Sequence, residues 1–171
     1  MTLPGRTVVL VPLSPPEYPE FIERQIVEYA DEKTRAGHWS AEEATARSRE
    51  AMRDFLPPRT PPAGHRFYKG VDDTGRRVGW VWLGPPPKEL NLQNSQWLYQ
   101  ITVEEFLRGQ GYGRALLQAA ESLVAADGED ALYLNVFAWN RGAKALYDSA
   151  GYEVHYDGGT EFGMHKPLMR R

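Results

Sequence analysis

The chain has 171 residues, of which 42% are hydrophobic and 25% charged, and its formal net charge is −3. This length and composition predict a single globular domain over residues 1–171. The charge gives no reason to expect a nucleic acid or an anionic membrane as a partner. Cysteine is absent, which excludes disulfides, thiolate metal sites and a cysteine nucleophile. No stretch is apolar over the roughly 18 residues that a bilayer span needs, and the start lacks a secretory-signal pattern, so we expect a cytoplasmic protein.

The first part of the chain predicts one strand followed by two helices. β-branched residues favour a strand over 7–11. Ser14 followed by two prolines indicates a helix start, and apolar residues recur at helical spacing to about residue 35. Ser40 and Glu43 form a capping-box pattern that opens a second helix, which ends before Pro57.

From residue 65 onward strands and helices are mixed. Strands are expected over 65–71, 77–83 and 95–103, and the second of these is apolar on both faces, which predicts a central position in a sheet. A helix from 113 to about 127, a strand over 132–138, a short helix capped by Asn140 and a final hairpin of 152–156 with 162–166 complete the order. The pattern predicts an α/β domain with a mixed sheet and helices on both faces.

The glycine-rich run Arg108-Gly109-Gln110-Gly111-Tyr112-Gly113 joins a predicted strand to a predicted helix. The first amides of a helix lack intrahelical acceptors, and the helix dipole favours an anion at that end. Glycines allow the backbone to approach a phosphate closely, and Arg108 and Arg114 can add charge-assisted contacts. Taken alone, the run fits either such a phosphate site or a plain tight turn.

Two common nucleotide motifs do not fit this run. A dinucleotide fingerprint needs Gly-x-Gly-x-x-Gly, whereas the glycines here stand at 109, 111 and 113. A Walker phosphate loop needs Gly-Lys-Ser/Thr, and the sequence contains no such tripeptide.

The run does resemble the Arg/Gln-x-x-Gly-x-Gly/Ala motif of the GNAT superfamily of N-acetyltransferases. Downstream, Asn140-x-x-Ala143-x-x-Leu146-Tyr147-x-x-x-Gly151-Tyr152 is similar to the second conserved block of that family. The similarity of motifs covers residues 100–166. The resemblance implies a mostly antiparallel mixed sheet with splayed central parallel strands, a cofactor-binding half at about 95–171 and acceptor-side helices at about 14–56.

The resemblance also implies a reaction, in which acetyl-CoA is the co-substrate and its acetyl group passes directly to a primary amine. Pantetheine would pair with the backbone of Ile101, Thr102 and Val103. Asn140 would contact the pantetheine amides and Tyr147 would act as general acid, since a phenol with a pKa near 10 can protonate a departing thiolate. The pyrophosphate would lie on the amides of Gly109, Gln110, Gly111, Tyr112, Gly113 and Arg114.

The sequence departs from the family pattern at the general base. Many relatives carry a glutamate on one of the two central strands, but the corresponding positions here are Gln100 and Asn135, which cannot take a proton. Glu104 is one candidate base; a water held by the two amides, or an acceptor that arrives neutral, is the alternative. The histidines share no metal-ligand spacing, so no metal is expected. We expect the core to be filled by Trp80, Trp82, Trp97 and Trp139. Trp39, between the first two helices, belongs either to the core or to an acceptor wall.

Two functions remain open at this point. One is an N-acetyltransferase acting on a small-molecule or peptide amine; the other is an acyl-CoA-binding sensor or structural module of the same fold. Many family members dimerise, so a homodimer is also open.

Overall fold

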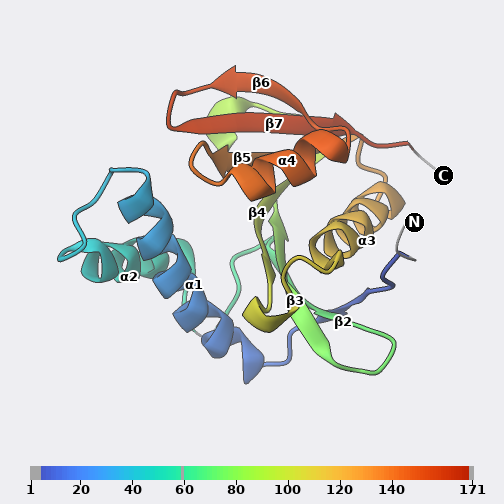
Figure 1. The fold of residues 1–171 in the computed structure, drawn as a ribbon, viewed down its shortest axis with the longest axis horizontal. Coiled ribbons are helices and arrows are strands. Elements are labelled where there is room, and N and C mark those ends of the chain that lie inside the picture. The colour runs from blue at the N-terminus through green and yellow to red at the C-terminus, as the bar shows by residue number, and fades with distance from the viewer. Residues whose placement is uncertain (1–4, 59, 170–171) are drawn as a thin grey trace.

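One open sheet forms the centre of the molecule (Figure 1). The computed structural model describes residues 5–58 and 60–169, and within them seven strands follow the order β1-β2-β3-β4-β5-β7-β6. Every neighbouring pair is antiparallel except β4 and β5, which are parallel. The strands are β1 Val9–Pro12, β2 Arg66–Val71, β3 Arg77–Gly84, β4 Ser95–Val103, β5 Ala131–Phe137, β6 Glu153–Asp157 and β7 Glu161–Pro167. The predicted mixed, mostly antiparallel sheet is confirmed.

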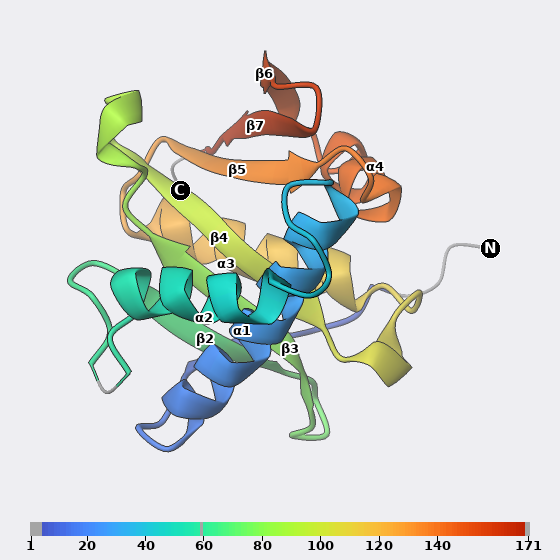
Figure 2. The same cartoon turned by 90° about the vertical axis from the view of Figure 1, so that its left-hand side faces the viewer.

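Helices cover both faces of this sheet, as the order of elements predicted (Figures 1 and 2). The α-helices of the described chain are α1 Glu17–Arg35, α2 Ala44–Phe55, α3 Tyr112–Ala126 and α4 Arg141–Ser149, and the short 3-10 turns are η1 Lys88–Leu90 and η2 Glu105–Leu107. Helices α1 and α2 pack on one face of the sheet, over β2 and β3. Helices α3 and α4 pack on the opposite face, where α4 lies against β5. Among the described residues, no helix combines the length and apolarity needed to cross a membrane.

Helix α3 shows why the sheet and its cover hold together. Leu116, Leu117, Ala120 and Val124 recur at helical spacing and are completely buried against the sheet. Burying each of the larger side chains contributes about 1.5–3 kcal/mol relative to exposure. Strand β3 is buried along almost its whole length, which confirms its predicted central position.

Aromatic side chains fill the space between the sheet and the first two helices. The Phe21 ring of α1 lies 5.2 Å from the Phe67 ring and 5.9 Å from the Trp80 ring. Trp82 stacks on Phe67 at 5.5 Å between centroids. Trp80 and Trp82 therefore belong to the core, as predicted, and they fix α1 against the sheet beside β4.

Strands β4 and β5 separate along their length. They pair only from Ser95 to Leu98 on β4 and from Ala131 to Leu134 on β5. The register between β3 and β4 shifts at this point, because Leu83 is opposite Leu98 and Trp82 is opposite Gln100, so Tyr99 is an extra residue in β4. Such a bulge bends a strand and re-aims its side chains. From Tyr99 and Asn135 onward, the facing edges of the two strands are not paired with each other.

Candidate active site

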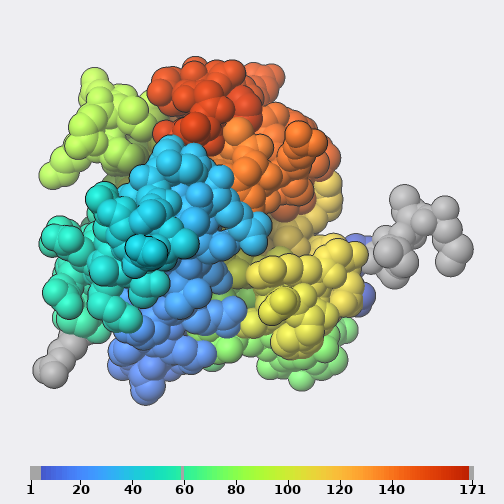
Figure 3. Space-filling view, turned by 60° about the vertical axis from the view of Figure 1, so that its left-hand side comes forward, coloured from blue at the N-terminus to red at the C-terminus, as the bar shows by residue number. Residues whose placement is uncertain are grey.

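A cleft of about 1070 Å³ opens where β4 and β5 diverge. Its walls come from α1, the ends of β4 and β5, the glycine-rich loop and the first turns of α3 and α4. The last turns of α1 and the α1–α2 turn reach across one end. Trp139 Nε1 donates to the Glu32 carbonyl of α1 at 3.3 Å, and His38 Nε2 of the turn lies 3.2 Å from Thr160 Oγ1. Figure 3 shows this turn, in light blue, lying against the orange and red segments of β5, α4 and β7.

The glycine-rich loop lies at the opposite end of the cleft. Gly109 and Gly111 have φ values of +73° and +90°, a left-handed conformation that favours glycine. Gly111 immediately precedes α3 and its carbonyl accepts the Ala115 amide, so the amides of the first helical turn remain available to an anion. Residues of the run that line the cleft are Arg108, Gly109, Gly111 and Gly113, and Arg114 directly after it also lines the cleft.

The side chains of Gln110 and Tyr112 contact other parts of the protein and do not line the cleft. The Gln110 amide donates to the Phe106 carbonyl at 3.2 Å. Tyr112 is 3% exposed, its ring lies under the Arg6 guanidinium, and its hydroxyl accepts from Arg76 at 3.2 Å. Only their backbone amides can therefore contribute to a phosphate site.

We expect Gly111→Ala to weaken CoA binding about tenfold, because an L-residue is strained at this φ by about 1 kcal/mol or more and the amides that follow it would shift. Gly75→Ala is the matched control: Gly75 has a φ of +85° in the β2–β3 turn, away from the cleft. Both variants should lose about 1 kcal/mol of folding stability, but only Gly111→Ala should change the dissociation constant for CoA in a calorimetric titration. Equal CoA affinities would contradict a role of this loop in binding.

Asn140 and Tyr147 both line the cleft from α4. Asn140 caps the helix, since its Oδ1 accepts the Ala143 amide at 3.2 Å. Tyr147 is 6% exposed, and burial together with the nearby Glu32 charge raises the pKa of its hydroxyl above the ordinary value. Within the described residues this hydroxyl makes no hydrogen bond, which leaves its proton available to a ligand.

Glu104 does not fit the predicted role of general base. Its carboxylate receives hydrogen bonds from Arg24 at 2.9 Å and Arg77 at 3.1 Å, and it is not among the residues that line the cleft. Burial opposes ionisation, but the two arginines outweigh it and lower the pKa of Glu104. A carboxylate held ionised by two cations is a weak proton acceptor, so we do not propose Glu104 as the base.

A pair of glutamates on α1, which the sequence did not single out, provides an alternative. Glu28 Oε2 accepts from Gln100 Nε2 at 2.9 Å and from Thr102 Oγ1 at 3.0 Å, which ties α1 to β4 beyond the bulge. Glu32 follows one turn later and lines the cleft. Burial raises the pKa of Glu32 to about 7, with a further contribution from the Glu28 charge and a partial offset by Gln100.

We expect Glu32→Gln to stabilise the fold in a pH-dependent way. The pKa of Glu32 is about 7 in the folded chain against 4.5 for the ordinary group. Between these values the unfolded chain loses a proton that the folded chain retains, so wild-type stability falls as pH rises through this window. The variant should gain about 1–3 kcal/mol at pH 8 and almost nothing at pH 4.5. Thermal unfolding at both pH values measures this; an equal gain at both would contradict the raised pKa.

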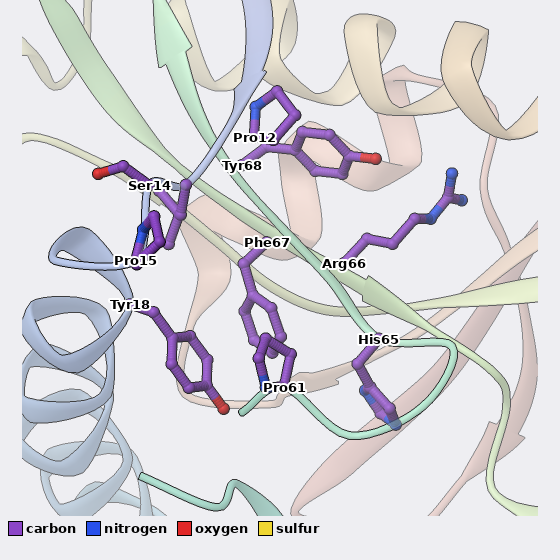
Figure 4. Close-up of a pocket in the computed structure, with 10 residues that line it drawn as sticks. Pro12, Ser14, Pro15, Tyr18, Pro61, His65, Arg66, Phe67 and Tyr68 are labelled. Atoms are coloured by element: carbon purple, nitrogen blue, oxygen red, sulfur yellow. The ribbon is translucent and has the colours of Figure 1, made fainter. Parts of the chain in front are cut away.

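A smaller cavity of about 320 Å³ lies where β1 passes into α1 (Figure 4). Proline and aromatic side chains line most of it, and the Tyr18 hydroxyl beside it donates to the Pro57 carbonyl at 3.1 Å. None of the predicted site residues lines this cavity. In the described parts of the chain, no three His, Asp or Glu side chains come together in a way that could hold a metal ion.

Residues 24–152 match the family model of the acetyltransferase (GNAT) family, so the chain belongs to this family. Among curated relatives, the N-acetyltransferase YdgE of Bacillus subtilis (strain 168) is 30% identical over 152 residues, which cover 89% of this chain and 92% of the relative. The N-acetyltransferase YycN of the same organism is 29% identical over 147 residues, covering 86% and 93%.

Solved structures agree with this assignment. The crystal structure of YycN superposes with a TM-score of 0.80 over 88% of this chain and 94% of that one, at 29% identity. The PaiA N-acetyltransferase of Thermoplasma acidophilum, crystallised in complex with coenzyme A, shares the fold with a TM-score of 0.67 at 20% identity, over 95% and 99% of the chains. The predicted fold and family are confirmed.

Proposed function

We propose that this protein transfers the acetyl group of acetyl-CoA directly to a primary amine. The observation that carries the proposal is that Glu32 and Tyr147 line the same β4–β5 cleft, where burial, and secondly the Glu32 charge, raise the pKa of Tyr147 and keep its hydroxyl protonated. One group is suited to accepting a proton near neutral pH and the other to donating one.

The donor would lie along the β4 edge of the cleft. Ile101, Thr102 and Val103 pair with β3 on one side, and the opposite edge of β4 is open beyond Leu98. An extended pantetheine arm can pair with that open edge, as a peptide adds to the edge of a sheet. Its pyrophosphate would then reach the amides that begin α3, where the helix dipole favours negative charge. Arg114 lines the same end and donates to Ser149 Oγ of α4, so its guanidinium is already held beside this site.

The chemistry follows from the two ionisable groups. An alkylammonium acceptor must lose a proton before its nitrogen can attack, and Glu32, with a pKa of about 7, is matched to receiving it at neutral pH. The nitrogen bonds to the thioester carbon, and the tetrahedral intermediate then collapses with cleavage of the carbon–sulfur bond. Tyr147 gives its proton to the departing thiolate, and the acetylated nitrogen loses its remaining extra proton, which restores the Tyr147 hydroxyl through solvent. The products are an acetamide, CoA thiol and the proton left on Glu32.

Release of CoA thiol tests this function. Purified protein with acetyl-CoA should liberate thiol only when an amine is added, and Glu32→Gln and Tyr147→Phe should abolish most of that release. CoA binding can be followed separately, because a ligand at 100 times its dissociation constant adds about 2.7 kcal/mol of apparent stability. Stabilisation by acetyl-CoA without thiol release from any amine would instead support a non-catalytic acyl-CoA-binding module.

A further inference from the structure

Three aromatic rings surround the ammonium group of Lys33. Its Nζ lies 5.4 Å from the ring centroid of Tyr29, 5.9 Å from that of Trp39 and 5.8 Å from that of Phe137. These distances are within the range of a cation–π contact, and quaternary and alkylated ammonium ligands are recognised in this way. We call Tyr29, Trp39 and Phe137 the aromatic cage. Within the described chain no carboxylate lies within ion-pair distance of Lys33, whose nearest polar contact is His38 Nδ1 at 3.5 Å.

The aromatic cage stands beside the proposed reaction centre. Its rings come from three segments: α1, the α1–α2 turn and the end of β5. Tyr29 and Phe137 line the cleft together with Lys33, and Lys33 directly follows Glu32. Phe137 is two residues beyond Asn135, which is about 7 Å along the strand. A single short molecule can therefore reach both Glu32 and the cage.

The charges at this end of the cleft favour a cation. The lining residues of α1 and β7 carry four carboxylates, against two cations of which Lys33 is one. The second cation, Arg35, has its guanidinium over the Trp139 ring at 4.8 Å and pairs with Asp31 at 3.0 Å. If the Lys33 side chain leaves the aromatic cage, the rings face a net negative wall.

We propose that the aromatic cage is a subsite for a second ammonium group of the acceptor and that Lys33 fills it in the free enzyme. The acceptor class is then a diamine or polyamine, with one amine at Glu32 and the next in the cage. This inference rests on the proposed function, since it places the acceptor of that reaction. Lys33 has a flexible four-carbon stem and can swing to solvent. A tethered group competes as if it were present at millimolar concentration, so Lys33 acts as a built-in competitor of the acceptor.

Paired acceptors of equal chain length test the subsite. Thiol release is measured with 1-aminobutane against 1,4-diaminobutane and with 1-aminohexane against 1,6-diaminohexane, and the ratio of kcat/KM for diamine to monoamine is compared between variants. A diamine offers two equivalent amines, so this ratio is about two when the second amine makes no contact with the enzyme. The ratio for the wild-type enzyme should exceed this value. Lys33→Met should raise the ratio about tenfold, whereas Phe137→Leu and Trp39→Leu should lower it by a factor of about 2–10. Lys33→Arg, which keeps a cation in the cage, should stay near the wild-type ratio.

Lys144→Met is the matched control. The Lys144 ammonium also lies over an aromatic ring, that of Phe162 at 5.3 Å, but it does not line the cleft, so its loss should leave the ratio as in the wild type. A ratio that does not respond to Lys33→Met and Phe137→Leu while thiol release continues would overturn the subsite and leave the proposed function standing. If no amine causes thiol release, the proposed function fails, and the subsite is then tested by calorimetric binding of 1,6-diaminohexane in the presence of CoA. The affinity for the diamine should rise in Lys33→Met and fall in Phe137→Leu. Unchanged affinities in both variants would overturn the subsite.

Discussion

Replacing Glu32 by glutamine is expected to lower kcat/KM for amine acetylation about 10²–10³-fold at pH 7. Glutamine keeps the shape of the side chain but cannot take a proton. Leaving an alkylammonium to ionise unaided at pH 7 costs about 4 kcal/mol, given a pKa near 10. The wild-type profile of kcat/KM against pH should show an acid limb near pH 7, where Glu32 ionises, and the variant should lack that limb.

Glu104→Gln is the control for this experiment. It makes the same change in a carboxylate that Arg24 and Arg77 hold outside the cleft. It should cost about 1–3 kcal/mol of stability, because Arg24 loses its carboxylate partner and Arg77 keeps only Glu20. Its kcat/KM should stay within about threefold of wild type, because Glu104 does not line the cleft and its change leaves transition-state contacts intact. A Glu32→Gln enzyme with a wild-type rate at pH 7, or a larger loss in Glu104→Gln, would return the role of base to Glu104 or to an ordered water.

Local patterns were sufficient to predict most of the elements. Strand β4 has the predicted bounds, 95–103, because its apolar and β-branched run ends at charged turn residues on one side and at a loop on the other. The start of α3 was also predictable, since Gly111 takes the left-handed conformation that glycine permits. The sequence thus predicted the glycine-rich turn that begins α3, and the phosphate site there stays a prediction.

The candidate base Glu32 was not predictable because its burial depends on contacts between distant segments. Glu32 belongs to a stretch of α1 dense in charge, which is typical of a solvent-exposed helix face. What buries it is the approach of α1 to β4, where Glu28 and Gln100 meet although they are 72 positions apart. The bulge at Tyr99 turns Gln100 and Thr102 toward α1. The alternation of apolar and polar residues over 95–103 does not indicate that the strand contains a bulge.

Two tryptophans illustrate the same limit. Trp139 was expected in the core, but it lies half-buried in the β5–α4 connection and lines the cleft, where its indole donates to the Glu32 carbonyl. Trp39, for which core and acceptor wall were both open, packs on Tyr29 at 5.4 Å beside the cleft. An aromatic residue in a connection can pack in the core or lie at the cleft. Which of these two positions Trp39 and Trp139 take depends on how the α1–α2 turn packs against β5.

Tyr147→Phe is expected to reduce kcat about 10²-fold while changing the CoA dissociation constant by less than about threefold. Phenylalanine keeps the packing of the ring against Tyr152, whose centroid is 5.6 Å away, but it cannot protonate the leaving thiolate. Because the hydroxyl makes no hydrogen bond within the described residues, its removal leaves no protein group unpaired. Single-turnover acetylation and calorimetric titration with CoA separate the two quantities.

Tyr152→Phe is the matched control, because it removes a neighbouring buried hydroxyl that has no partner among the described residues. Deleting an unpaired buried hydroxyl should be neutral or slightly stabilising, and it should leave kcat unchanged since Tyr152 does not line the cleft. If Tyr147→Phe and Tyr152→Phe lower kcat equally, the effect of Tyr147 is one of packing. If only Tyr147→Phe lowers kcat, and does so without loss of CoA affinity or thermal stability, the proton it donates is required in the step that breaks the carbon–sulfur bond.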